Sequence, residues 1–161
     1  MRIVAGRFGG RPLAAPKRSG TRPTSDKARQ ALFNVLEHAD WTPPLDGARV
    51  MDIYAGSGAL GFEAISRGAS FCLFVETAAA ARGTIRDNAE ALQLFGITRI
   101  HRRDATSLGT KPAGVGPPFD IAFMDPPYGH DLAPKTLRTL KEGGWLKPEA
   151  LVVLEVGEDE T

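Results

Sequence analysis

Four consecutive residues, Asp125-Pro126-Pro127-Tyr128, place a carboxylate, two rigid backbone units and an aromatic ring directly after an apolar run. Two consecutive prolines keep the neighbouring backbone extended and stiff. Such a segment can direct the Asp125 carboxylate and the Pro126 carbonyl at the two hydrogens of one amine, while Tyr128 offers a ring on which a base can stack. Accepting both hydrogens localises a nitrogen lone pair that ring delocalisation would otherwise make a poor nucleophile. The segment therefore predicts chemistry at an exocyclic amine, with a proline turn beside a buried tyrosine as the structural alternative.

A glycine-rich turn lies between an apolar run and a helical pattern. It falls within residues 49–64, where Gly56, Gly58 and Gly61 match the spacing G-x-G-x-x-G. Glycine at such positions allows a tight turn, close approach of the backbone to a ligand and close packing of the next helix on the strand. The N–H groups that begin this helix can face a bound cofactor. The stretch predicts a strand, a cofactor loop and a helix, although the triplet alone is equally typical of an ordinary turn.

A carboxylate follows this loop at the spacing typical of a ribose-binding acid. Glu76 ends a second apolar run, 71–75, and lies twenty residues beyond Gly56. In a doubly wound sheet the second strand lies beside the first, so its terminal carboxylate faces the same crevice and can accept hydrogen bonds from both ribose hydroxyls. Glu76 is therefore predicted to bind the ribose of an adenosine-containing cofactor. The alternative is an acid favoured by the dipole of the following helix.

Acidic residues recur where the predicted strands end, at Asp52, Glu76, Asp104 and Asp125. In an open parallel sheet the carboxyl ends of all strands share one edge, and ligands bind there, at the point where the strand order reverses. We therefore expect these four carboxylates to gather at one edge of the sheet.

Alternating strands and helices predict an α/β fold with a doubly wound, mostly parallel, Rossmann-like sheet that follows a basic N-terminal arm and helix. Helices are expected over 24–39, from the glycine loop to 67, over 77–96 and over 132–141. Strands are expected from 49 into the glycine loop and over 71–75, 99–102, 119–124 and 150–156.

Length and composition indicate one compact domain. A chain of 161 residues can bury a substantial core without metal or disulfide support. The single cysteine, Cys72, lies within an apolar run and indicates a reducing compartment. The sequence has neither the apolar segment of a signal peptide nor a run of roughly 18 apolar residues. We therefore expect a cytoplasmic monomer, and the scattered His38, His101 and His130 predict no metal site.

Positive charge is concentrated near the N-terminus. Residues 1–29 contain eight Lys or Arg and one acid, so the remaining residues hold twelve basic and eighteen acidic side chains, which gives +7 against −6. Basic segments with glycine and proline often bind polyanions, because neutralising phosphates releases counterions. A solvated, disordered tail is the alternative. The side chains predicted to contact RNA are Arg2, Arg7, Arg11, Arg22 and Lys27.

Taken together, these motifs resemble a known enzyme family. Residues 125–128 after the fourth predicted strand, combined with the glycine loop after the first, are similar to S-adenosylmethionine-dependent methyltransferases that act on amines of bases. The N-terminal pattern narrows the resemblance to the RsmD family of bacterial small-subunit (16S) ribosomal RNA guanine-N2 methyltransferases. The stretches that carry this pattern are Arg2-Ile3-Val4-Ala5-Gly6, Gly10-Arg11, Arg22-Pro23-Thr24-Ser25-Asp26 and Ala31-Leu32-Phe33-Asn34.

The resemblance implies S-adenosylmethionine as the cofactor, with its methionine end on the glycine loop. Asp52 would then sit behind the ammonium, Glu76 on the ribose and Asp104 on the adenine amine. The residues implied to bind the cofactor are Asp52, Tyr54, Gly56, Ser57, Gly58, Glu76, Asp104 and Ala105. The residues implied to be catalytic are Asp125, Pro126, Pro127 and Tyr128, which would hold a guanine of ribosomal RNA or of an assembling small ribosomal subunit.

The resemblance also predicts the organisation of the chain. Residues 1–40 are expected to form the arm and helix that face RNA, and residues 41–161 the methyltransferase core. The family pattern continues past the fifth strand into a strand hairpin, whereas this sequence ends in Glu158-Asp159-Glu160-Thr161. We therefore expect a core that lacks the final hairpin.

Other functions share part of this pattern. A nicotinamide-dependent dehydrogenase would use the same glycine loop and ribose acid, but hydride transfer has no use for the amine-binding segment at 125–128. A non-catalytic RNA-binding module would account for the basic arm and leave the four carboxylates without a role. Methylation of DNA adenine N6 or of protein glutamine also suits the segment at 125–128, so the target remains open at the level of its chemistry.

Overall fold

The computed structural model describes residues 1–15, 25–127 and 131–155. Its helices are α1 (Asp26–His38), α2 (Ala59–Ser66), α3 (Ala79–Ala91) and α4 (Leu132–Glu142), with short 3-10 turns η1 (Phe95–Ile97), η2 (Ala105–Ser107) and η3 (Ala113–Val115). Its strands are β1 (Arg49–Ile53), β2 (Phe71–Val75), β3 (Thr98–His101), β4 (Phe119–Met124) and β5 (Leu146–Leu154). Tyr128 and Arg22 lie outside the described residues. Among the described helices, none is long and apolar enough to cross a lipid bilayer.

The five strands form one sheet in the order β3-β2-β1-β4-β5, and every neighbouring pair is parallel. This confirms the predicted doubly wound class. The order reverses at β1, whose Val50 pairs with Cys72 of β2 on one side and Ile121 of β4 on the other. The carboxyl ends of β1 and β4 therefore meet at the switch point, where open α/β sheets bind ligands.

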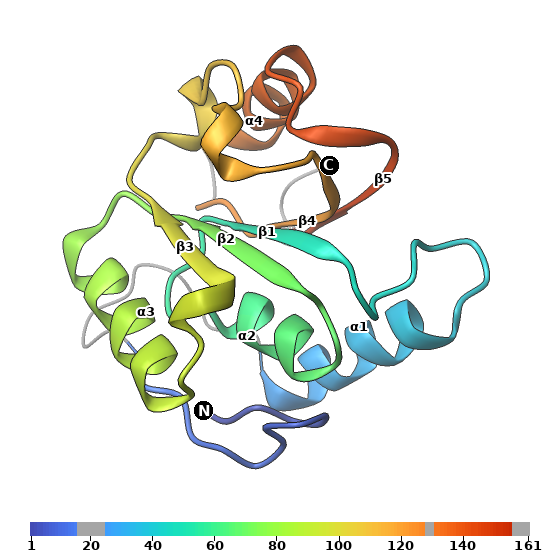
Figure 1. Cartoon of the computed structure of the whole chain (residues 1–161), viewed down its shortest axis with the longest axis vertical. Coiled ribbons are helices and arrows are strands. Elements are labelled where there is room, and N and C mark those ends of the chain that lie inside the picture. The colour runs from blue at the N-terminus through green and yellow to red at the C-terminus, as the bar shows by residue number, and fades with distance from the viewer. Residues whose placement is uncertain (16–24, 128–130, 156–161) are drawn as a thin grey trace.

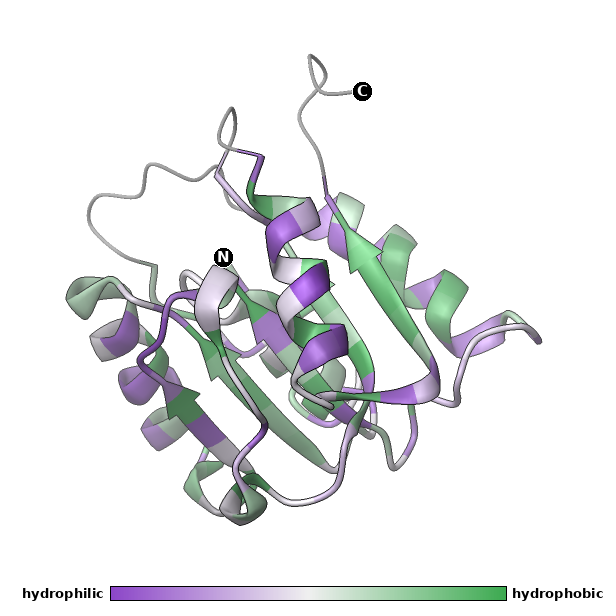
Figure 2. Cartoon of the chain, turned by 90° about the horizontal axis from the view of Figure 1, so that it is seen from above, coloured by the Kyte–Doolittle hydropathy of each residue, from purple (hydrophilic) through white to green (hydrophobic). Residues whose placement is uncertain are grey.

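Side chains of the central strands alternate between two hydrophobic cores, as strand geometry requires. Val50 and Cys72 belong to the core under α1, α2 and α3, whereas Met51 and Leu73 belong to the core under α4, η2 and η3. Figure 1 shows α4 on one face of the sheet, and α2, α3 and the N-terminal arm on the other. The strands are hydrophobic and the outer helix faces hydrophilic (Figure 2). Both faces of the sheet are thus covered, as a parallel sheet demands.

Helix α1 begins where its capping signal predicts. Ser25 is the N-cap, and its hydroxyl accepts a hydrogen bond from the Ala28 N–H at 3.1 Å. The helix then packs over the second half of the sheet, with the ring of Phe33 5.4 Å from that of Phe123 on β4.

The predicted end of α3 at 96 is wrong, because the helix stops at Ala91. Gln93 takes a left-handed conformation with φ of 59°, and Leu94 N–H donates to the Ala89 carbonyl at 2.8 Å while Gln93 N–H donates to Glu90 at 3.0 Å. These two bonds make a Schellman motif, which ends a helix. A glutamine fills the position that glycine usually takes. The first glycine after the helix is Gly96, which belongs to η1, and for this reason the predicted helix end was too late.

Strand β5 begins four residues before the predicted 150, at Leu146. Leu146 pairs with Phe119, but the next paired residues are Leu151 and Ile121, so β5 uses five residues where β4 uses two. Such a register shift is a bulge, which bends one strand away from its neighbour. Lys147 is polar and exposed, so the hydrophobic pattern does not indicate a strand in this part of the sequence.

The N-terminal arm folds back on the body of the protein. Ile3 N–H donates to the Arg11 carbonyl at 3.0 Å and Gly10 N–H to the Ile3 carbonyl at 2.7 Å, which closes a hairpin-like loop. Ile3 is fully buried and Leu13 is 5% exposed, and both belong to the hydrophobic core beneath α1, α2 and α3. The first part of the arm is therefore a packed element and not a solvated tail.

A buried carboxylate on α2 holds this arm in place. Glu63 is fully buried and accepts hydrogen bonds from the N–H groups of Val4 at 2.8 Å and Ala5 at 3.1 Å. It also pairs with Arg29 of α1 at 3.4 Å and with Arg67 at 2.8 Å. One side chain thus joins the arm, α1 and α2.

Replacing Glu63 with Ala is expected to lower the free energy of unfolding by about 3 to 5 kcal/mol, the range for removing one partner of a buried ion pair. The buried guanidinium groups of Arg29 and Arg67 would each lose one of their acceptors, and two backbone N–H groups would lose theirs. Chemical denaturation followed by circular dichroism measures the effect. The control Glu90→Ala, at an exposed site on α3, should change the free energy by less than about 0.5 kcal/mol. Equal stabilities of the two variants would refute the role of Glu63.

Candidate active site

The loop between β1 and α2 has the conformation that its glycines predict. Gly56 and Gly58 have φ of 59° and 83°, in the left-handed region. A Cβ on Gly58 would lie 2.8 Å from the Phe62 ring, and one on Gly61 would lie 2.6 Å from Cys72 Sγ on β2. Gly58 and Gly61 are therefore needed for close packing of α2 on the sheet. A Cβ on Gly56 would meet nothing within 4 Å, so the loop presents an open side there.

Tyr54 supports this loop from its first residue. It has φ of 61°, a left-handed conformation unusual for a bulky residue. The N–H groups of Tyr54 and Ala55 both donate to the Val75 carbonyl, at 3.0 and 3.2 Å, and tie the loop to the end of β2. The Tyr54 hydroxyl lies 2.7 Å from the buried Thr136 hydroxyl on α4. Thr136 thus links the glycine loop to α4, and no motif in the sequence marked it.

Glu76 reaches from β2 to the glycine loop. Its Oε1 accepts a hydrogen bond from Gly56 N–H at 2.8 Å, and its Oε2 accepts one from Ala78 N–H at 3.0 Å, just before α3. Glu76 was interpreted either as a ribose-binding acid or as an acid favoured by the dipole of the next helix. Its position is compatible with both, because the carboxylate precedes α3 and also faces the glycine loop. Since each carboxylate oxygen can accept two hydrogen bonds, acceptor positions remain for a ligand.

Asp52 lies behind the loop and is only 2% exposed. Its Oδ2 accepts a hydrogen bond from Gly61 N–H at 2.9 Å in the first turn of α2. Burial raises the pKa of this carboxyl to about 8, opposed by the Gly61 hydrogen bond and reinforced by the charges of Asp125 and Glu76. A buried acid surrounded by like charges is stabilised in its ionised form by a nearby cation. This position suits the ammonium of an amino acid moiety.

Asp125 follows β4 at the switch point. Its N–H lies 3.4 Å from the carbonyl oxygen of Ile53, the last residue of β1, so the segment after β4 runs beside the start of the glycine loop. Pro126 is buried and Pro127 is exposed, so the chain passes from the core to the surface between these two residues. Burial, with a smaller effect of Glu155, raises the pKa of the Asp125 carboxyl to about 6.

The remaining predicted cofactor residues differ in their surroundings. Asp104 is exposed and caps η2, accepting hydrogen bonds from the N–H and hydroxyl of Thr106 at 2.8 and 2.7 Å, which lower the pKa of its carboxyl. Ala105 next to it is buried. Ser57 is 8% exposed, and its hydroxyl lies 3.9 Å from Met1 Sδ, toward the arm. Its place in the cofactor site stays a prediction.

The structure divides the predicted RNA-binding side chains between two places. All four in the described residues, Arg2, Arg7, Arg11 and Lys27, are exposed. Arg7 N–H bonds to the carbonyl of Ser66, and the Arg11 guanidinium to that of Ala91, so these two lie at the far ends of α2 and α3 from the glycine loop. Lys27 is in the first turn of α1, and Arg2 adjoins that turn through Arg29.

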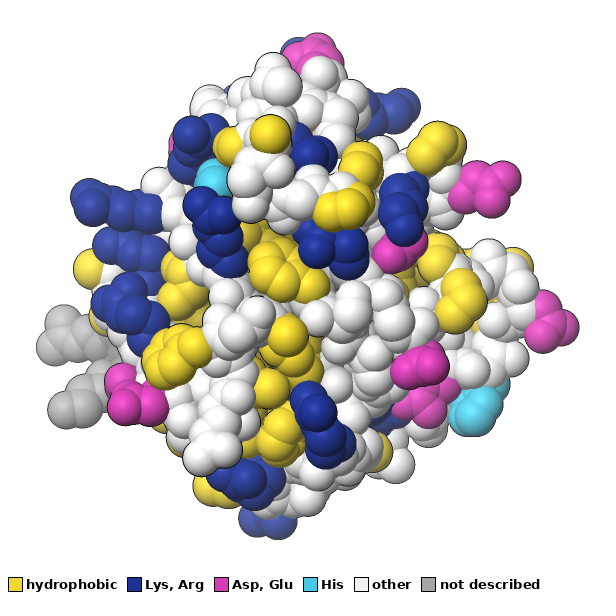
Figure 3. Space-filling view, in the orientation of Figure 1, with side chains coloured by type: hydrophobic (Ala, Val, Ile, Leu, Met, Phe, Trp, Pro, Cys, Tyr) yellow, Lys and Arg dark blue, Asp and Glu magenta, His cyan; other side chains and the backbone are white. Residues whose placement is uncertain are grey.

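Two exposed arginines outside the predicted RNA-binding set lie at the carboxyl edge of the sheet. Arg102 and Arg103 follow β3 directly and precede Asp104 at the carboxyl edge of the sheet. Figure 3 shows Lys and Arg side chains gathered on the side of the molecule that carries α3 and β3. Their place in the sequence, directly before the strand-end acid Asp104, is the signal that could have indicated that Arg102 and Arg103 lie near the candidate site.

Comparison with known proteins identifies the family. A family model described as "Conserved hypothetical protein 95" matches residues 1–161. The ribosomal RNA small subunit methyltransferase D of Escherichia coli K12 is 37% identical over 155 residues, which cover 96% of this chain and 74% of that protein. The protein of the same name from Haemophilus influenzae is 34% identical over 160 residues, covering 99% of this chain and 80% of that protein. The chain belongs to the RsmD family.

Solved structures agree with this assignment. The Escherichia coli yhhF structure superposes with a TM-score of 0.81 at 34% identity, covering all of this chain and 84% of that one. A coclaurine N-methyltransferase structure has a TM-score of 0.60 at 16% identity, covering 93% of this chain and 40% of that one, and shows the fold alone. The chain therefore has the Rossmann-like fold of class I methyltransferases. These relatives favour a methyltransferase over the dehydrogenase considered above.

Glu76→Ala is expected to weaken binding of S-adenosylmethionine by about 1 to 3 kcal/mol, or about fivefold to 150-fold, because hydrogen bonds to a charged acceptor are lost. The variant also frees Gly56 N–H, so Glu76→Gln, which retains one acceptor oxygen, should lose less. Isothermal titration calorimetry on folded protein measures both. Wild-type affinity in Glu76→Ala would remove this residue from the cofactor site, and Glu90→Ala provides the matched control.

Proposed function

We propose that this protein transfers the methyl group of S-adenosylmethionine to the exocyclic N2 amine of a guanine in 16S ribosomal RNA, in the cytoplasm. S-adenosylmethionine is the methyl donor. The observation that carries the proposal is the position of Asp125, the residue before Pro126, beside the last residue of β1, at the switch point of a methyltransferase fold. The relatives named above as ribosomal RNA small subunit methyltransferases support RNA as the substrate.

The described residues fit this cofactor. The open side of Gly56 leaves space over the loop, the N–H groups at the start of α2 lie beside it, and Glu76 borders the same space. Asp52 places a buried carboxylate behind the loop for the ammonium group. The cofactor supplies an electrophilic methyl carbon on a sulfonium.

The chain's own part in the reaction is to orient the amine. The Asp125 carboxylate and the Pro126 carbonyl accept the two N2 hydrogens, which turns the nitrogen lone pair toward the methyl carbon. The nitrogen–carbon bond forms as the sulfur–carbon bond breaks, and the nitrogen then loses one proton to the Asp125 carboxylate or to water. Since the pKa of Asp125 is about 6, this carboxyl is mostly ionised at neutral pH and can accept the proton.

Two alternatives use the same amine chemistry. DNA adenine N6 and the amide of protein glutamine also present two hydrogens on a delocalised nitrogen. The test is to incubate the protein with methyl-labelled S-adenosylmethionine and, separately, naked 16S RNA, small ribosomal subunits, duplex DNA and protein substrates. Digestion then identifies the labelled group. N2-methylguanine from RNA supports the proposal, and label in adenine or glutamine refutes it.

Asp125→Ala is expected to lower the rate of methyl transfer by about a hundredfold or more, because a group that acts only in the transition state is lost. Affinity for S-adenosylmethionine should stay within about threefold of wild type, since Asp125 binds the base and not the cofactor. Single-turnover kinetics and calorimetry measure the two effects separately. Methylation at the wild-type rate would refute the proposed role of Asp125.

Affinity for S-adenosylmethionine should rise with pH between about 6 and 8. In the free protein Asp52 is largely protonated below its pKa of about 8, and it must release that proton to pair with the ammonium. Each pH unit in this window should therefore change affinity by up to about tenfold. The raised pKa has the opposite effect on folding of the free protein, because the contribution of Asp52 to stability falls as pH rises from about 4 to 8.

Asp52→Asn keeps an acceptor for Gly61 N–H and removes the titration. Its affinity should be lower at pH 8 and should lose most of its pH dependence, apart from titration of the ligand's own amine. Calorimetry across the pH range provides the comparison. An identical pH profile in the variant and wild type would show that Asp52 does not face the ammonium.

RNA affinity should depend on the exposed cations. Replacing Arg2 and Lys27 with Gln should reduce the slope of log affinity against log salt by about 1.4 to 1.8 units, if both contact phosphates at roughly 0.7 to 0.9 per contact. A second double variant, in which Arg7 and Arg11 are replaced with Gln, removes the same charge at the far ends of α2 and α3 and shows whether those positions also contact RNA. Substitutions are preferred to truncation because Ile3 and Leu13 belong to the core. Unchanged slopes in both double variants would remove the arm from the RNA interface.

A further inference from the structure

A groove lies at the edge of the sheet opposite to the glycine loop. It has a volume of about 750 Å³ and is lined by residues 40–44 before β1, by Asp120 near the start of β4 and by residues 147–150 of β5. All of these belong to the amino ends of parallel strands, whereas the candidate active site lies at their carboxyl ends. The proposed reaction therefore does not use this groove.

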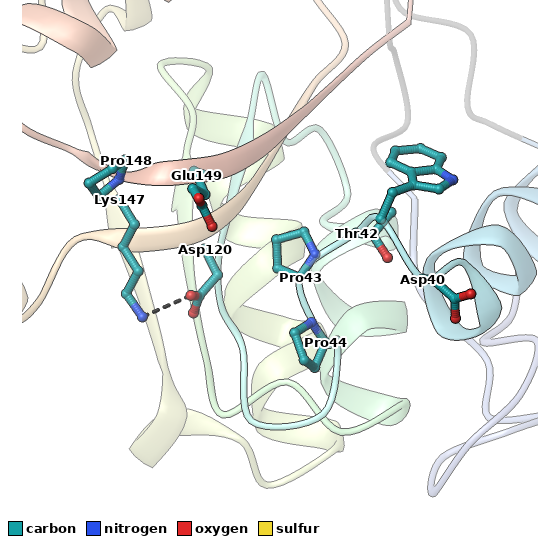
Figure 4. A pocket seen from close by; sticks show the side chains of 10 residues that line it. Asp40, Thr42, Pro43, Pro44, Asp120, Lys147, Pro148 and Glu149 are labelled. Atoms are coloured by element: carbon teal, nitrogen blue, oxygen red, sulfur yellow. Dashed lines mark hydrogen bonds and ion pairs between the residues drawn. The ribbon is translucent and has the colours of Figure 1, made fainter.

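The bulge in β5 creates one wall of the groove. Between Phe119 and Ile121 the register shifts, so Asp120 faces the part of β5 that leaves the regular ladder. Its carboxylate accepts hydrogen bonds from Arg49 N–H at 2.9 Å and from Lys147 Nζ at 2.8 Å. Figure 4 shows Lys147, Pro148 and Glu149 along this wall, with Pro43 and Pro44 between Asp120 and the opposite wall at Asp40 and Thr42. Three prolines make these walls stiff before any partner binds.

An exposed aromatic ring and unpaired negative charge define the chemistry of the groove. Trp41 is 73% exposed, whereas Trp145 is fully buried. Asp40 and Glu149 are exposed and form no ion pair with any described residue, while Asp120 is neutralised by Lys147. The lining therefore has a net negative charge beside a large apolar surface. Such a combination opposes a nucleic acid and suits a cation that can stack on the ring.

We propose that this groove binds an arginine- or lysine-rich peptide segment of another protein. A guanidinium or ammonium group stacks on the Trp41 ring, and neighbouring cations pair with Asp40 and Glu149. The stiff proline walls reduce the entropy lost on binding. Because the groove and the carboxyl edge are on opposite sides of the sheet, the peptide and the proposed RNA substrate can bind together. The proposal does not depend on the proposed function.

The probe is a short peptide of alternating arginine and serine, used unlabelled for tryptophan fluorescence and labelled with fluorescein for anisotropy. A glutamate and serine peptide is the control. The unlabelled arginine peptide should shift the emission of Trp41 to shorter wavelength in a saturable manner, because the ring leaves water. Trp145 is buried and contributes a constant background. The glutamate peptide should cause no shift. Equal shifts with both peptides, or no shift with either, would overturn the proposal.

Anisotropy of the labelled peptide then locates the site. Trp41→Ala should weaken binding by about threefold to tenfold, and Asp40→Asn combined with Glu149→Gln by about tenfold. Asp87→Asn combined with Glu90→Gln removes the same charge from exposed sites on α3 and should leave the affinity unchanged. Equal losses in the two double variants would show general electrostatic attraction. A short single-stranded RNA that shifts the emission of Trp41 in the same way without any peptide would assign the groove to nucleic acid, and either result refutes the proposal.

Discussion

The buried carboxylate of Glu63 is the interaction on which the arrangement of this protein depends. It accepts hydrogen bonds from two backbone N–H groups of the arm and pairs with Arg29 and Arg67. A buried carboxylate is tolerated only when such partners replace water. Because Glu63 lies on the helix that begins at the glycine loop, the same network that docks the arm also holds that helix from its outer side. The first residues of the chain are therefore part of the support of the site.

Much of the fold was predictable because its strands are apolar runs that only a doubly covered parallel sheet can bury. The runs at 71–75 and 119–124 became strands with the predicted bounds. Two boundaries were not predictable from local signals. Gln93 ends α3 in a left-handed conformation between the buried Leu92 and Leu94, and the start of β5 lacks hydrophobic periodicity because residues 147–149 of the bulge are exposed. In both places long-range contacts outweigh local preference.

The candidate site was predictable to the extent that backbone conformation requires particular residues. Positive φ and close packing require glycine at Gly58, and the spacing to Glu76 follows from the pairing of β1 with β2. The support around these residues was hidden, because threonine is a common residue and nothing in the sequence distinguishes Thr136 from other threonines on helices. Glu63 was hidden for a related reason, since its partners come from positions as far as 59 residues away.

The distribution of charge also depends on the fold and not on the order of the sequence. In the sequence, the +7 of residues 1–29 stands apart from an acidic remainder. In the structure, Arg29 is used internally by the Glu63 network, and Arg7 and Arg11 are carried to the far ends of α2 and α3. Arg102 and Arg103, from the nominally acidic part, reach the carboxyl edge, while Asp40 and Glu149 remain at the opposite edge. A parallel sheet places its two sets of strand ends on opposite sides, so the fold, and not the order of the sequence, decides which charged side chains become neighbours.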